Sequence, residues 1–80
     1  MSTTMAPPVL DIRQLGACVE RMACVLAAFD ALQRGQSLIV VNDHLPRGLR
    51  AHFDEQRPGM FAWRPLEEGP HVFRVEIERI

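Results

Sequence analysis

Two hydrophobic periods follow each other in the first half of this chain. Residues 9–13 alternate with a period of two and place Leu10 and Ile12 on one face, which is typical of a short strand. Residues 17–34 then follow the period of a helix, which Gly35 ends. Its apolar stripe consists of Cys18, Met22, Val25, Leu26, Phe29 and Leu32.

The second half repeats this strand and helix and then adds two strands. Residues 37–41 form a continuous apolar run, as expected of a central strand covered on both faces. Pro46 suits the first turn of a helix that runs to about Gln56, and the Pro-Gly pair at 58–59 ends it. Residues 60–64 and 72–80 are predicted strands, joined by a turn at 67–70.

The order β-α-β-α-β-β predicts an α+β fold, a two-layer α/β sandwich. The strands that flank the first helix should be parallel, because a helix of about 18 residues has the length of a right-handed crossover. The last two strands, joined by a short turn, should form a hairpin. We expect a four-stranded mixed sheet with both helices on one face, as a single domain over residues 9–80 after a flexible tail of residues 1–8. The other face, with Val9, Ile39 and Val41, could be a partner surface or an ordinary solvated face.

Composition and charge narrow the class of protein. The 80 residues are 48% hydrophobic and 24% charged, which suits a globular domain with one modest core. A net charge of −1 gives no overall field that would attract nucleic acid. We expect no membrane span or secretory signal, and free thiols, since Cys18 and Cys24 would lie about 9 Å apart along one helix. A cytoplasmic protein follows from these features.

Candidate chemistry gathers in the two loops that precede the helices. After parallel strands, both helices begin at the same sheet edge, which is where open α/β folds bind ligands. Arg13 from the first loop would meet Asn42, Asp43, His44 and Arg47 from the second, and these five form the predicted ligand site. Two interpretations stay open: Asp43 orients the His44 imidazole for a ligand or proton, or Asn42 or Asp43 caps the helix and His44 fills the turn.

Several segments carry a resemblance to a known family. Residues 10–15 (LDIRQL) followed by a helix, and residues 35–38 (GQSL) leading into an apolar strand, resemble the TusA/SirA-like superfamily of bacterial sulfur carriers. Residues 41–46 (VNDHLP) and 66–70 (LEEGP) are closer to its uncharacterised branch, domain-of-unknown-function family 2249. That branch usually has a second Asp where this chain has Leu45. The resemblance covers nearly all of residues 9–80 and implies the same two-layer sandwich.

The resemblance also directs attention to Cys18. Sulfur carriers of the superfamily have a Cys-Pro dipeptide at the start of the first helix, where this chain has Ala17 and Cys18. Cys18 lies in the first helical turn, where the helix dipole and Arg13 could lower the pKa of its thiol. It also lies on the apolar stripe, where burial would oppose ionisation, and the interpretation as a small buried hydrophobe is the favoured one.

Three functional hypotheses follow. The first is a non-catalytic module that binds a small ligand or a protein partner at the predicted site, with a smooth helix face (Cys24, Ala27, Ala28 and Ala31) through which two copies could associate. The second is a sulfur carrier with a persulfide on Cys18. The third is a metal- or haem-associated redox domain centred on His44, with Asp43, Cys18 and His71 as further ligands, although no ligand spacing supports it. A hydrolase is least expected, because no nucleophile, base and orienting group occur together.

Overall fold

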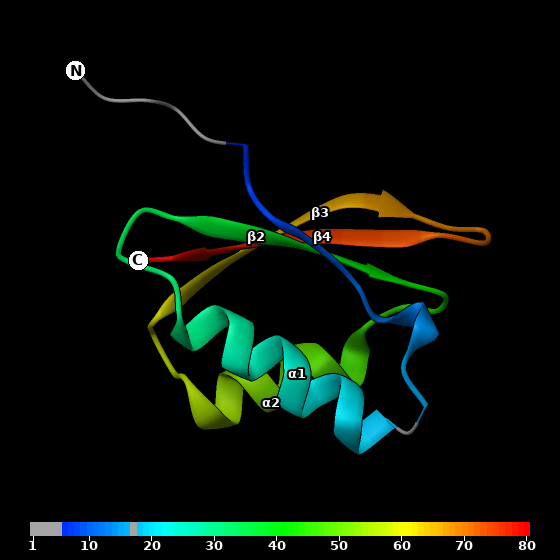
Figure 1. The fold of residues 1–80 in the computed structure, drawn as a ribbon, viewed down its shortest axis with the longest axis horizontal. Helices are drawn as coiled ribbons and strands as arrows, with labels where there is room; N and C mark the ends of the chain where they lie inside the picture. Colours follow the sequence, from blue (N-terminus) through cyan, green and yellow to red (C-terminus); the bar gives the residue numbers. More distant parts are fainter. Residues whose placement is uncertain (1–5, 17) are drawn as a thin grey trace.

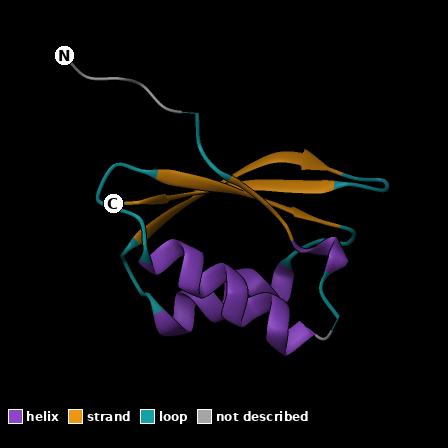
Figure 2. Ribbon diagram, viewed as in Figure 1, coloured by secondary structure: helices purple, strands orange, loops and turns teal. Residues whose placement is uncertain are grey.

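The computed structural model describes residues 6–16 and 18–80, without the side chains of Cys18 and Val19. Its sheet lies on one side and both helices lie on the other (Figures 1 and 2), which confirms the predicted two-layer α+β sandwich. The elements are β1 (Val9–Asp11), a 3₁₀ turn (Ile12–Gln14), α1 (Cys18–Asp30), β2 (Ser37–Asn42), α2 (Arg47–Gln56), β3 (Phe61–Glu68) and β4 (Phe73–Arg79). Of the predicted tail, residues 1–5 lie outside the described chain, whereas the Pro8 carbonyl accepts the N–H of Ile39 at 2.9 Å.

The strands are ordered β1-β2-β4-β3 in one sheet. β1 pairs with β2 in parallel, and β4 pairs antiparallel with both β2 and β3. The predicted parallel pair and the predicted hairpin are therefore confirmed. Both helices begin at the same end of the molecule (Figure 1), so the loops that follow β1 and β2 lie at one edge.

Two elements end earlier than predicted. β1 stops at Asp11 instead of Arg13, because the Asp11 carboxylate accepts the N–H of Arg13 at 3.1 Å and begins the 3₁₀ turn. α1 ends at Asp30 instead of residue 34. The N–H of Leu32 bonds to the Phe29 carbonyl at 2.9 Å, which is the tighter spacing of a helix end, and Gly35 turns the chain at a φ of 87°.

β3 is longer than predicted, since it continues through Pro65 to Glu68. A proline is tolerated there because β3 is an edge strand, where the missing N–H leaves no ladder bond unmade. The register of β3 against β4 shifts between Pro65 and Glu67, so Leu66 lies in a bulge.

The core lies between the sheet and the helices. Phe53 of α2 packs edge-to-face on Phe29 of α1 at 5.1 Å and on Phe61 of β3 at 5.3 Å between ring centroids. Phe61 and Trp63 are half-buried against this core. Ala28 also packs against the core, so its predicted place on the outer face of the first helix is wrong. The other buried residues of this cluster are Ile12, Val25, Leu38, Val40, Leu49, Val75 and Ile77. Val41, predicted on the opposite face of the sheet, is also buried, with 7% exposed.

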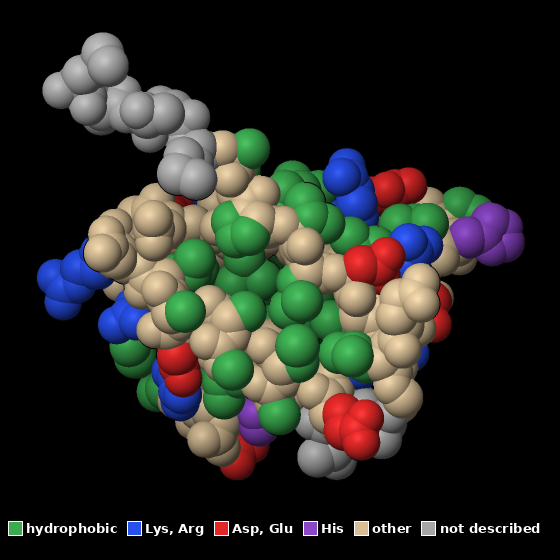
Figure 3. Space-filling model, in the orientation of Figure 1, with side chains coloured by type: hydrophobic (Ala, Val, Ile, Leu, Met, Phe, Trp, Pro, Cys, Tyr) green, Lys and Arg blue, Asp and Glu red, His purple; other side chains and the backbone are tan. Residues whose placement is uncertain are grey.

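The second face of the sheet carries ion pairs. Arg64 bonds to Glu76 at 3.3 Å and to Glu78 at 2.7 Å, and Arg74 bonds to Glu67 at 3.2 Å. This network of ion pairs favours the interpretation of an ordinary solvated face over that of a partner surface. Hydrophobic side chains instead gather on the flank between the sheet and α1 (Figure 3). Neither α1 nor α2 is long and apolar enough to cross a membrane, and the described chain has no other α-helix.

Candidate functional site

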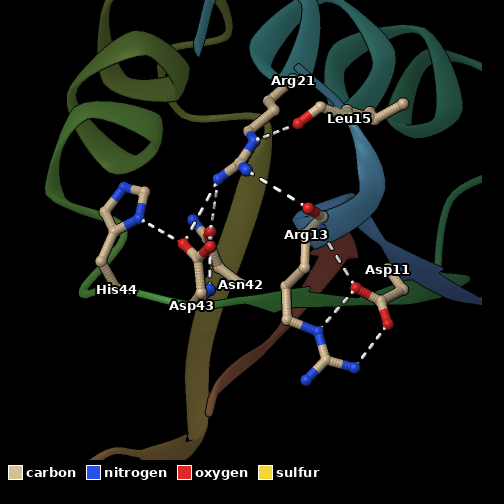
Figure 4. Close-up of polar contacts among 7 residues, drawn as sticks. All are labelled: Asp11, Arg13, Leu15, Arg21, Asn42, Asp43 and His44. Atoms are coloured by element: carbon tan, nitrogen blue, oxygen red, sulfur yellow. Dashed lines mark hydrogen bonds and ion pairs between the residues drawn. The ribbon is translucent and has the colours of Figure 1, made fainter. Parts of the chain in front are cut away.

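Arg21 of α1 joins the two loops at the predicted edge (Figure 4). Its side chain is only 15% exposed. The guanidinium donates from Nε to the Leu15 carbonyl at 3.1 Å, from Nη2 to the Arg13 carbonyl at 3.4 Å and from Nη1 to Asn42 Oδ1 at 3.2 Å. One planar cation therefore fixes the loop after β1 against the loop after β2.

Asn42 is the last residue of β2 and is 4% exposed. Its Oδ1 accepts from Arg21 and from the backbone N–H of Asp43, the latter at 2.8 Å. In the described chain the N-cap of α2 is Pro46, with no side-chain hydrogen bond to the helix. The interpretation that Asn42 or Asp43 caps the second helix is therefore wrong, and Asn42 instead satisfies the turn that presents Asp43.

Asp43 and His44 form an exposed pair. His44 Nδ1 lies 2.7 Å from Asp43 Oδ1, and Arg21 Nη1 donates to the same oxygen at 3.3 Å. The hydrogen bond from His44 and, after it, the contact with Arg21 lower the pKa of the Asp43 carboxyl. Because an ionised carboxylate only accepts, the proton of this hydrogen bond is on Nδ1 of His44, and in that tautomer Nε2 is an acceptor. The His44 side chain is 61% exposed, so this nitrogen is open to a ligand.

The Arg13 guanidinium turns toward Asp11. Its Nε and Nη2 bond to the two oxygens of that carboxylate at 2.9 and 2.6 Å, and this pairing lowers the pKa of Asp11. Figure 4 shows the Arg13 side chain directed away from His44 and Asp43. Arg13 therefore contributes its backbone carbonyl to the site, where it accepts from Arg21, while its guanidinium is paired with Asp11.

A hollow of about 40 Å³ lies beside His44. This volume holds a few atoms of a ligand and is far below that of an enclosed substrate pocket. Its lining residues are Ile12, Arg21, Met22, Asn42, His44, Pro46, Gly48 and Leu49. Arg47 instead lines a separate open groove of about 330 Å³, on the other side of the α2 N-terminus. The structure thus brings Asn42, Asp43 and His44 together but places Arg47 in a different hollow.

The residues predicted as possible metal ligands were His44, Asp43, Cys18 and His71. Among the residues that the structure describes, no three His, Cys, Asp or Glu residues form a group that could hold a metal ion. His71 is exposed between the end of β3 and the start of β4. Cys18 is the first residue of α1. Its side chain, and so its predicted burial, lies outside the described part of the structure.

Arg21 is the site residue that the pattern analysis missed. It lies three residues after Cys18 and four before Val25, so helical spacing places it at the border of the apolar stripe. A charged residue in that position needs polar partners close to the core. The position of Arg21 beside the apolar stripe was the signal that the sequence offered. Which loop acceptors it meets could not be predicted, because their convergence depends on the tertiary fold.

Fold and site together define a small two-layer α+β domain with a polar site at one sheet edge. Residues 9–79 match the family described as uncharacterized conserved protein (DUF2249), and the chain belongs to this family. No curated protein matches the chain, and no solved structure does. The Asn42–His44 segment that carried the resemblance in the sequence is the segment that Arg21 holds.

Proposed function

We propose that this protein is a non-catalytic binding module that holds a small ligand or a side chain of a protein partner at the Asn42–His44 edge. The supporting observation is the Arg21 contact set. It places a nearly buried guanidinium on two loops and so fixes an exposed Asp43–His44 pair. Pre-ordering of this kind lowers the entropic cost of binding.

The chemistry of the pair indicates the class of ligand. The Asp43 carboxylate is an acceptor, since its pKa is lowered, and in the tautomer with the proton on Nδ1 the second ring nitrogen of His44, Nε2, is another acceptor. A group with N–H or O–H donors, such as an amine, a guanidine or a hydroxyl, fits both acceptors. The hollow beside His44 is large enough only for the tip of such a group, which supports recognition rather than catalysis.

A place in the TusA-like superfamily belongs to this proposal, and the shared β-α-β-α-β-β order supports it. A sulfur carrier is the second candidate function. It is favoured by one observation, that α1 begins with Cys18 at the same edge of the sheet, where a helix dipole favours a thiolate. We place either function in the cytoplasm, because the free thiol of Cys24 suits a reducing compartment.

The binding proposal is tested by backbone amide NMR of the full chain, titrated with a set of small amines, guanidines and alcohols. We expect shifts to cluster at the amides of Arg13, Leu15 and Asn42–Leu45. His44→Ala should abolish them, whereas His71→Ala, which removes an exposed histidine from the β3–β4 turn, should leave them unchanged. Shifts that persist in His44→Ala would contradict the proposal.

Native mass spectrometry of protein purified without reductant or chelator separates the alternatives. The binding module predicts the mass of the bare chain or of the chain with an organic ligand. An added sulfur atom that Cys18→Ala removes and Cys24→Ala retains would establish the carrier instead. A bound metal or haem that His44→Ala removes would establish the redox domain.

A further inference from the structure

The outer side of β3 has backbone groups that point away from the sheet. The N–H of Ile80 donates to the Met60 carbonyl at 3.1 Å, so the backbone groups of Met60 point toward β4. Along an antiparallel strand, successive residues direct these groups alternately toward the partner strand and away from it. Ala62 and Arg64 therefore direct their backbone groups toward β4, while Phe61 and Trp63 direct theirs outward. β3 is the terminal strand, and within the described chain no other strand pairs with this side.

On its helix side this edge carries Phe61, Trp63 and Pro65 and lies beside a groove. The groove of about 330 Å³ separates Trp63 from α2 and has Leu45, Pro46 and Ala51 in its lining. Arg50 closes part of it with its guanidinium carbon 5.5 Å from the Trp63 ring centroid. Leu45 and Leu66 are 40% and 45% exposed. An exposed strand edge that adjoins apolar surface is a site where another strand can add to the sheet.

The sequence of β3 fits a second copy of itself. In an antiparallel pair with Trp63 opposite Trp63, the N–H and C=O groups of these two residues bond to each other, and each Phe61 N–H donates to the Pro65 carbonyl of the other copy. The N–H that Pro65 lacks would point to the opposite Phe61 carbonyl, so the central bonds are kept. On the helix side of the sheet, aromatic rings and Pro65 would meet.

Charges on the other side of the sheet are complementary in the same register. Ala62 would face Arg64 of the second copy, and its neighbour on β4 is Glu78. Only the methyl group of Ala62 would separate that Arg64 from Glu78. No like charges would lie directly opposite each other. The two Arg64 side chains would be diagonal neighbours, and each stays beside Glu76 of its own chain.

We propose that the outer edge of β3 joins two copies of this chain in an antiparallel pair centred on Trp63, so that two four-stranded sheets become one. The opposite edge of the sheet is a poorer candidate. β1 has three residues, of which the last, Asp11, would place a carboxylate in the pairing region.

The test is sedimentation velocity of the full chain from low micromolar to near-millimolar concentration, with Ala62→Lys and Ala62→Glu. In the single chain, Ala62→Lys faces Glu78 and should fold as well as the wild type. In the pair, each introduced lysine faces Arg64 of the other copy. Two such like-charge contacts should weaken dimerisation by about tenfold. In the single chain Ala62→Glu faces Glu78, a like-charge contact that costs some stability. In the pair Arg64 of the other copy faces the introduced carboxylate and offsets that contact, so dimerisation should strengthen.

Val9→Lys is the matched control, since it adds the same charge at an exposed position on the opposite edge and should leave dimerisation unchanged. Circular dichroism of each variant confirms that it is folded. A wild-type chain that stays monomeric at all concentrations overturns the proposal. Equal weakening by Val9→Lys and Ala62→Lys also overturns it.

Discussion

Arg21 satisfies the polar groups of two loops with one side chain. Its four acceptor groups are two backbone carbonyls, the Asn42 amide oxygen and the Asp43 carboxylate, and they come from segments separated by a helix and a strand. The planar fork of a guanidinium can reach all of them at once, which an ammonium group cannot. At the scale of single residues, the predicted ligand site therefore depends on Arg21, which holds the site residues Asn42 and Asp43 in place.

We expect Arg21→Ala to lower the free energy of unfolding by about 2 kcal/mol, because buried Asn42 Oδ1 and the Leu15 carbonyl lose a charged donor. Arg21→Lys should recover only part of this loss. Urea denaturation measures the change, and amide hydrogen exchange should quicken at Asp43 and His44. Arg34→Ala, at an exposed position after α1, serves as the control and should change stability by less than about 0.5 kcal/mol. An unchanged Arg21→Ala would show that the loops do not depend on this contact.

The elements show where sequence patterns are sufficient and where they fail. Period and turn residues predicted the element order, the parallel first pair and the hairpin, because these depend on local spacing and chain length. The predicted ends of β1 and β3 were wrong, because a side-chain hydrogen bond determines the first and the edge position of the strand allows the second. Asp11 bends the chain into a 3₁₀ turn, and Pro65 is allowed inside β3 only because the strand lies at the sheet edge.

The candidate site was predictable to a similar extent. The rule that parallel strands end at one edge correctly placed the loop after β1 beside the loop after β2, because it depends only on topology, and in the structure Arg21 bonds to both loops. It could not show that the Arg13 side chain pairs with Asp11, or that Arg47 lines another groove. Those details depend on side-chain directions, which the sequence pattern does not contain.

Gly69 in the β3–β4 turn provides an element-scale prediction. Its φ is 90°, and a Cβ there would lie 2.9 Å from Cζ of Phe73. Gly69→Ala should therefore cost about 1–2 kcal/mol of backbone strain and a further amount for moving the ring. Gly59→Ala, at a φ of 72° with no atom near the added Cβ, carries the strain alone. Thermal unfolding of both variants should show the larger loss in Gly69→Ala, and equal losses would mean that the Phe73 contact has no effect.

At the scale of the whole molecule, hydrogen bonds and ion pairs at the surface link elements that also pack together in the core. Arg57 after α2 bonds to Asp30 at the end of α1 at 2.6 and 2.9 Å, and this contact lowers the pKa of Asp30. Glu76 of β4 has a lowered pKa because the Ser37 hydroxyl of β2 donates to it and, after that, because Arg64 of β3 does. One carboxylate thus joins the helices and the other joins three strands.

These lowered pKa values determine how stability depends on pH. A carboxyl group whose pKa is lower in the folded chain contributes stability that is present above its unfolded pKa and is lost as the pH falls through the folded value. The ordinary values are 3.8 for Asp30 and 4.5 for Glu76, so stability should be constant above about pH 5 and should fall below about pH 4. Urea unfolding at a series of pH values measures this profile. Glu76→Gln should make the acid fall shallower, because it removes one of the linked protons, whereas Glu55→Gln, on the exposed surface of α2, should leave the slope unchanged. A Glu76→Gln profile that coincides with the wild type would show that the contacts between Glu76 and its two partners do not stabilise the sheet.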